Sequence, residues 1–226
     1  MSVTKRPVDL RAAAPVLGVD LRSGLRYPTG LAVLGRDRRL RALAVVRTDE
    51  EIEAAVARWR PALIAIDAPL ALPEGRCCAD PACECARFGI YREIDRLCAR
   101  LGYRPFPTLL PSMVKLTLRG SALSARLLAA GERVAEVYPG MVQDILGIPR
   151  KQAGLDGLTR GLRRAGVRGI PRSRRVTHDE LDAVTCALAA LLHIEGSTEI
   201  LGSGVPVPFI APLPGLPTSM SPAPVP

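Results

Sequence analysis

The chain has 226 residues, a net charge of +9 and 48% hydrophobic residues. This length allows one sizeable core or two small ones, and the apolar content excludes a natively disordered chain. No apolar run approaches the roughly 20 residues of a membrane-spanning helix, and residues 1–14 lack the apolar segment of a signal peptide. We therefore expect a cytoplasmic protein without a membrane partner, whose six cysteines are mostly reduced.

Arginine supplies most of the positive charge, because lysine occurs only at positions 5, 115 and 151. Such a balance suits a polyanionic partner, and nucleic acid is the foremost candidate. A genome biased towards alanine and arginine would give the same composition, so charge alone leaves the partner open.

Short apolar runs bounded by turn residues predict strands in the first part of the chain. The runs that end near Asp20 and Asp67 are the most apolar and are typical of buried strands. Between them, Thr48 and Glu51 have the pattern of a capping box, which begins a helix that ends before Pro61. The predicted strands lie at 15–21, 29–35, 39–46 and 62–70. Three antiparallel strands, a helix and a parallel core strand in this order indicate the α/β class.

The rest of the chain is mostly helical by the same reasoning, with helices expected at 87–101, 121–130, 155–166 and 176–193 and a strand at 133–139. We expect a loose arm at 1–14, one domain at 15–204 with a Cys-rich insertion loop at 73–86, and a Pro-rich tail at 205–226. Eight of the 22 tail residues are proline. A tail of this composition is expected to be extended or disordered.

The helix at 176–193 begins with several acids. Thr177 and Glu180 match a capping box, and apolar residues at helical spacing form one buried face. Asp179 and Asp182 are three residues apart, so they share one side of the helix beside that face. Acids in a first turn complement the helix dipole, but this explanation suits Asp182 poorly, because Asp is a weak helix former beyond the cap.

Asp20 and Asp67 each end a strand that is otherwise apolar. A buried carboxylate is costly unless it is paired, protonated or bound to a metal, although Asp also favours strand-to-turn junctions. Neighbouring parallel strands would bring both acids to the carboxyl edge, where open α/β sheets bind their ligands. With Glu136 and the acids of the last helix they would need a divalent cation, and an all-oxygen set suits Mg²⁺ or Mn²⁺.

At these residues the chain resembles the DUF429 family of predicted nucleases, which have a ribonuclease H-like fold. The resemblance extends from about Val16 to Gly202. Its pieces occur in the expected order: GVDL at 18–21, AIDAPL at 65–70, LPSMVKLTLRG at 110–120, VAEVYPG at 134–140, LGIPRKQAGLDGL at 146–158 and HDELDAVTCAL at 178–188.

The resemblance implies a mixed five-stranded sheet, with three antiparallel strands followed by two parallel ones and helices on both faces. It also implies that the first and fourth strands each supply one acid and the last helix one or two. Asp20, Asp67, and Asp182 with Asp179 occupy those places. Glu136 on the fifth strand is then either a ligand or a residue that orients nearby Arg and Lys side chains.

Basic residues lie near these acids in sequence and could hold phosphates. A solvated basic surface is the alternative for each of them. The predicted phosphate contacts are Lys115, Arg119, Arg150, Lys151, Arg174 and Arg175. His178, at the start of the last helix, is either a proton shuttle or an exposed first-turn residue.

Four cysteines, Cys77, Cys78, Cys83 and Cys85, occur within nine residues. Four thiolates can bind zinc, but two neighbouring cysteines and a C-x-C pair differ from the usual C-x₂-C spacing. Reversible disulfides and unpaired thiols are the alternatives.

These observations leave three functions open. The first is a divalent-metal-dependent nuclease that cleaves phosphodiester bonds with metal-activated water. The second is a nucleotide-binding phosphotransferase or ATPase of the actin-like superfamily, whose members duplicate the fold, whereas this chain has room for one copy. The third is a non-catalytic module that binds nucleic acid or a protein.

Overall fold

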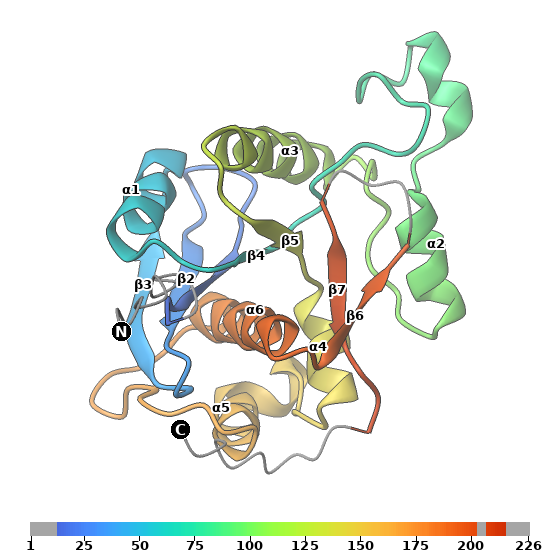
Figure 1. The fold of residues 1–226 in the computed structure, drawn as a ribbon. Helices are drawn as coiled ribbons and strands as arrows, with labels where there is room; N and C mark the ends of the chain where they lie inside the picture. The colour runs from blue at the N-terminus through green and yellow to red at the C-terminus, as the bar shows by residue number, and fades with distance from the viewer. Residues whose placement is uncertain (1–12, 203–206, 216–226) are drawn as a thin grey trace, which may run out of the picture.

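The computed structural model describes residues 13–202 and 207–215. Residues 1–12 of the expected arm lie outside the described part, as do 203–206 and 216–226 of the expected domain end and tail. The described strands form one sheet in the order β3-β2-β1-β4-β5-β7-β6 (Figure 1). Their bounds are β1 Val16–Asp20, β2 Thr29–Leu34, β3 Leu40–Val46, β4 Ile64–Asp67, β5 Val134–Glu136, β6 Thr198–Leu201 and β7 Phe209–Pro212.

The first five strands confirm the predicted fold class. β1 and β3 each pair antiparallel with β2, and β4 pairs parallel with both β1 and β5. This is the ribonuclease H-like order of three antiparallel strands followed by two parallel ones. The sheet has seven strands rather than five, because β7 and β6 extend it beyond β5.

The expectation of a disordered Pro-rich tail is wrong for β7. All four β7 residues are buried, and the strand pairs parallel with β5 and antiparallel with β6. Proline is tolerated here because Pro208 precedes the strand and Pro212 ends it, where no ladder N–H is required. The Pro208 carbonyl instead accepts a hydrogen bond from the Glu136 N–H at 2.8 Å. The free edge of β5 thus orders a segment whose composition favours disorder.

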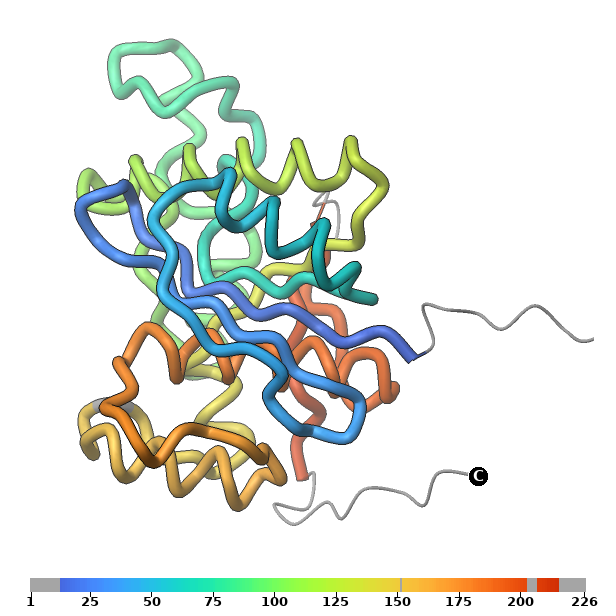
Figure 2. Tube along the Cα trace, turned by 90° about the vertical axis from the view of Figure 1, so that its left-hand side faces the viewer, coloured from blue at the N-terminus to red at the C-terminus, as the bar shows by residue number. Residues whose placement is uncertain are grey.

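Helices cover both faces of the sheet, as Figures 1 and 2 show. Side chains of β1 alternate between the two layers: Leu17 and Val19 join the apolar cluster of α1 and α3, whereas Val16 joins that of α4, α5 and α6. The helix bounds are α1 Asp49–Trp59, α2 Glu93–Arg100, α3 Val114–Ala129, α4 Pro139–Ile145, α5 Gly154–Arg164 and α6 His178–Ile194, with short 3₁₀ turns η1 Glu84–Phe88 and η2 Lys151–Ala153.

Two helices differ in extent from the prediction. The helix expected at 87–101 is divided into η1 and α2 by Gly89, whose φ of 83° cannot continue an α-helix. The helix expected at 121–130 already begins at Val114 and includes Gly120. That glycine lies against the chain after β4, where an added Cβ would come within 2.7 Å of the Pro69 carbonyl oxygen. Close packing therefore outweighs the low helix propensity of glycine.

The described residues form one sheet, which counts against the duplicated fold of actin-like phosphotransferases. Within the same residues, no helix combines the length and apolar character needed to cross a bilayer.

Candidate metal centre and substrate pocket

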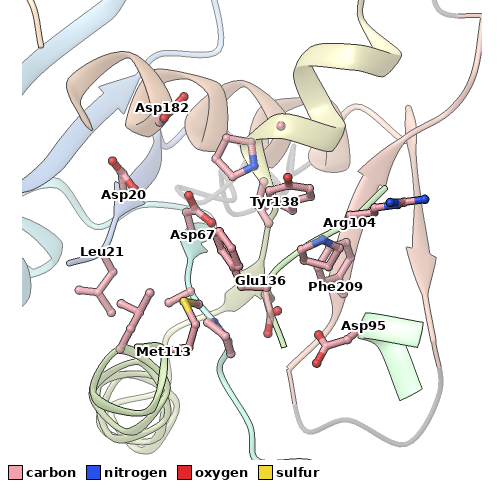
Figure 3. Close-up of a pocket in the computed structure, with 18 of the residues that line it drawn as sticks. Asp20, Leu21, Asp67, Asp95, Arg104, Met113, Glu136, Tyr138, Asp182 and Phe209 are labelled. Atoms are coloured by element: carbon pink, nitrogen blue, oxygen red, sulfur yellow. The ribbon is translucent and has the colours of Figure 1, made fainter. Parts of the chain in front are cut away.

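Asp20 and Asp67 are direct neighbours in the sheet. The parallel pairing of β1 and β4 places Asp20 opposite Asp67 as the last pair of the register. Figure 3 shows both side chains at the same edge, and both line one pocket. The prediction that these two strand ends meet is confirmed by this register.

Helix α6 adds Asp182 to the same edge. The helix backbone lies directly on the sheet at two glycines: a Cβ at Gly18 would be 2.1 Å from the Ala183 carbonyl oxygen, and a Cβ at Gly30 would be 2.0 Å from that of Asp179. No side chain fits at either position. These glycines fix how closely the acidic first turns of α6 approach β1 and β2.

Asp182 is buried and its carboxylate accepts a 2.8 Å hydrogen bond from the Gln143 side-chain amide. The same amide donates to the Thr185 hydroxyl at 3.2 Å. Gln143 comes from α4, so this short helix, absent from the sequence prediction, orients one of the acids. Its sequence signal is Pro139, because proline favours the first position of a helix.

The electrostatics of the edge are unfavourable for a fully ionised set of acids. Burial raises the pKa of Asp20 well above its ordinary value, and the negative charges of Asp67, Asp182 and Asp179 raise it further. Arg22 acts in the opposite direction, but its side chain is 42% exposed. Cation binding would relieve this repulsion.

The other residues at the start of α6 have different surroundings. Asp179 is half-buried and faces Arg22 at 3.6 Å. Glu180 closes the capping box with Thr177 and pairs with Arg174 at 2.6 Å. His178 is half-buried and lies outside the residues that line the pocket, and its Nδ1 is buried without a hydrogen-bond partner.

Glu136 forms a buried ion pair that sequence reasoning missed. Both of its carboxylate oxygens accept from Arg92, at 2.6 and 2.7 Å, and one also accepts the Leu70 N–H at 2.9 Å. Arg92 pairs in addition with Asp95 at 2.9 Å, and Asp95 accepts from the Thr108 hydroxyl. Glu136 is therefore paired with Arg92, which is not one of the predicted phosphate contacts, and its role as a ligand or as an orienting residue stays a prediction. Nothing in the local pattern marks the pairing of Arg92 with Glu136, because the two residues are 44 positions apart in sequence.

The pocket has a volume of about 580 Å³. Its acidic side holds Asp20, Asp67 and Asp182 (Figure 3). Arg104 and the aromatic side chains of Phe106 and Tyr138 also line it, and Phe106 is 69% exposed. The RPF stretch at 104–106 was the available signal for this combination of cation and aromatic ring.

The spacing of the carboxylates limits how they can hold metal. Across the described parts of the chain, the four cysteines at 77–85 are the only group of three or more His, Cys, Asp or Glu residues whose ligand atoms gather closely enough to hold one ion together. The acids therefore do not close into one three-carboxylate cage. Their arrangement fits ions that each take one or two carboxylates and complete their shell with water, as Mg²⁺ commonly does.

Three of the six predicted phosphate contacts have ion-pair partners within the protein. Arg119 pairs with Asp49 at 2.7 Å and donates to two backbone carbonyls. Arg150 lines the pocket but pairs with Asp144. Arg174 pairs with Glu180, as described above. The side chains of Lys115 and Arg175 are exposed, and that of Lys151 lies outside the described set.

The four cysteines of the insertion come together in space. They lie at residues 77–85, and the chain from 70 to 91, which is fully described, contributes nothing to the pocket lining. The cluster is thus separate from the acidic edge.

The solved structures to which this chain is similar include two of RuvC. "T. thermophilus RuvC in complex with Holliday junction substrate" is 20% identical, with a TM-score of 0.47, and the match covers 81% of this chain and 96% of that one. "Thermus thermophilus RuvC structure" is 19% identical with the same TM-score, covering 80% and 96%. A comparison with curated proteins found no match. A family model described as "Protein of unknown function (DUF429)" matches residues 18–205, so the chain belongs to the DUF429 family.

Proposed function

We propose that the protein is a divalent-metal-dependent nuclease. The observation that carries the proposal is the convergence of Asp20, Asp67 and Asp182 at one edge of a pocket. Asp20 and Asp182 are buried, and the pKa of Asp20 is raised by burial and by the neighbouring acids. Repulsion among three carboxylates at one edge of a pocket favours the binding of a cation there.

The donor set fits Mg²⁺ or Mn²⁺. Every donor at this edge is a carboxylate oxygen, which suits these hard cations and not a soft one. We assign Asp20 and Asp67 to one ion and Asp182, with Asp179 beside it, to a second. Such ions, when bound, activate water for attack on a phosphodiester and stabilise the leaving oxygen.

The protein's own residues supply the geometry. Gln143 holds the Asp182 carboxylate by the hydrogen bond at 2.8 Å. Gly18 and Gly30 allow α6 to approach the sheet, so that its acids reach the ends of β1 and β4. Arg92 donates hydrogen bonds to both carboxylate oxygens of Glu136, so we do not assign Glu136 as a metal ligand.

The remaining pocket residues suit a nucleic-acid strand. Arg104 can contact a phosphate, while Phe106 and Tyr138 can stack against bases, which is how many proteins bind single strands. Lys115 and Arg175 are exposed and remain candidate phosphate contacts. The net charge of +9 favours the same polyanion.

The test is cleavage of labelled single-stranded DNA, duplex DNA, RNA and a branched junction with Mg²⁺ or Mn²⁺. We expect wild type to cleave at least one substrate, and Asp20→Asn and Asp182→Asn to lose about 100-fold or more, since metal-ion catalysis contributes several kcal/mol. Asp37→Asn is the matched control, because Asp37 lies away from the pocket and pairs with Arg41. Equal residual cleavage in wild type and Asp20→Asn would identify a contaminant and contradict the proposal. Binding without cleavage would instead support a non-catalytic module.

A further inference from the structure

The insertion between β4 and α2 has almost no apolar core of its own. From residue 74 to residue 91 the only buried side chain is that of Cys85. Both views show this segment extending away from the sheet and its helices (Figures 1 and 2). Segments of this size rarely hold a fixed shape by packing alone and usually need a disulfide or a metal.

The four cysteine sulfurs have the spacing of a tetrahedral metal site. All four lie within 4.8 Å of one another, and the Cys77–Cys83 and Cys78–Cys85 sulfur pairs are each 3.8 Å apart. Four sulfurs bound at about 2.3 Å to one central ion would be about 3.8 Å from each other. A disulfide would bring two of them to about 2.05 Å, and the four are free cysteines.

The chain is folded so that its two cysteine pairs meet. The Cys83 N–H donates to the Asp80 carbonyl, and the Ala86 N–H donates to the Cys83 carbonyl. Arg76 supports the other side by donating from Nε to the Cys78 carbonyl at 3.0 Å. These turns explain how a C-C-x₄-C-x-C spacing, which differs from the usual zinc motifs, still gathers four thiols.

We propose that Cys77, Cys78, Cys83 and Cys85 bind one Zn²⁺ in a closed, structural site. Four thiolates in tetrahedral array suit Zn²⁺ and exclude the hard cations assigned to the acidic edge. All four positions are filled by protein, so the site has no place for a substrate or a reactive water. This inference does not depend on nuclease activity.

The site has a structural consequence for the pocket. Next to the cysteines, Glu74 accepts a hydrogen bond from the Glu93 N–H at the start of α2, at 2.9 Å. Arg92, the preceding residue, carries the buried ion pairs with Glu136 and Asp95. The zinc-closed loop therefore fixes the segment that joins Asp67 to Arg92, two residues that line the pocket.

The experiment measures metal in full-length protein purified without chelator from zinc-supplemented culture. Elemental analysis should find about one zinc per chain in wild type and less than about a tenth in Cys83→Ser/Cys85→Ser. Cys98→Ala is the matched control, because Cys98 is a thiol outside the cluster, and it should retain zinc. Asp20→Asn should also retain it, which separates this site from the acidic edge.

Cobalt substitution of wild type provides a readout that needs no variant. A tetrahedral tetrathiolate site should give intense thiolate-to-Co²⁺ charge-transfer bands and strong visible d–d bands. Wild type without zinc, zinc retained in the double variant, iron in place of zinc, or a weak octahedral cobalt spectrum would each overturn the proposal. Circular dichroism of the double variant shows whether the domain remains folded, so that loss of zinc can be ascribed to the missing ligands.

Discussion

The environment of Asp20 is unfavourable for an ionised carboxylate. It is 6% exposed, it lies beside Asp67 in the sheet register, and burial followed by three negative neighbours raises its pKa. A residue that burial and like charges disfavour is a candidate for function rather than for stability.

Neutralising Asp20 should therefore stabilise the metal-free protein. In the presence of a chelator, we expect Asp20→Asn to raise Tm by about 2–4 °C, which corresponds to roughly 1 kcal/mol for a chain of this size. Calorimetry of wild type and variant measures the shift, and Asp37→Asn, at an exposed ion pair, should change Tm little. A lower Tm for Asp20→Asn would mean that the aspartate is a structural residue.

In contrast to the charge of Asp20, we expect the charge of Arg92 to stabilise the folded protein. Its guanidinium is buried between Glu136 and Asp95. Arg92→Met leaves two buried carboxylates without their partner, so we expect a loss of about 3–5 kcal/mol in the free energy of unfolding.

Denaturant unfolding of Arg92→Met measures this loss, with Arg126→Met as the matched control. Arg126 also pairs with two acids, Asp49 and Glu53, but its side chain is 47% exposed. Its loss should cost no more than about 1 kcal/mol. Similar losses for the two variants would show that the buried network contributes no more than a surface pair.

Among the secondary-structure elements, the packing of α6 against the sheet determines where Asp182 lies. Gly18→Ala would place a Cβ about 2.1 Å from the Ala183 carbonyl oxygen, so the helix must move. We expect a loss of about 1–3 kcal/mol, together with loss of divalent-cation binding as Asp182 is displaced. Gly24→Ala is the control, because an added Cβ there meets nothing within 4 Å. If both alanine variants matched wild type in unfolding and cation titrations, the close contact of Gly18 with α6 would not determine the position of Asp182.

The insertion loop should depend on its zinc for order. Trypsin cleaves after Arg and Lys, and Arg76 and Arg87 lie in a segment with little apolar burial. We expect limited trypsin digestion to leave this segment intact in the zinc-loaded protein and to cut it at these arginines after chelation, since loosely held loops are the preferred sites of nicking. Mass spectrometry of the fragments identifies the sites. Equal cutting with and without zinc would contradict the predicted ordering.

Across the whole molecule, the features that could be predicted from the sequence are those that depend on short stretches of the chain. Strands β1 and β4 and their terminal acids follow from short apolar runs, and the capping boxes at Thr48 and Thr177 are present. The path of β7 was not predictable, because pairing with β5 overrides a Pro-rich composition. The Arg92–Glu136 and Gln143–Asp182 contacts were also missed, because their members lie 44 and 39 residues apart in sequence.

We propose that Asp20, Asp67 and Asp182 hold divalent cations at the carboxyl edge of β1 and β4. The most direct measurement is anomalous diffraction at the manganese edge from crystals of the full chain soaked in Mn²⁺. We predict density within about 2.0–2.3 Å of carboxylate oxygens of Asp20 and Asp67, and its absence in Asp20→Asn crystals. Well-ordered crystals that bind Mn²⁺ elsewhere, or leave this edge without density, would contradict the account.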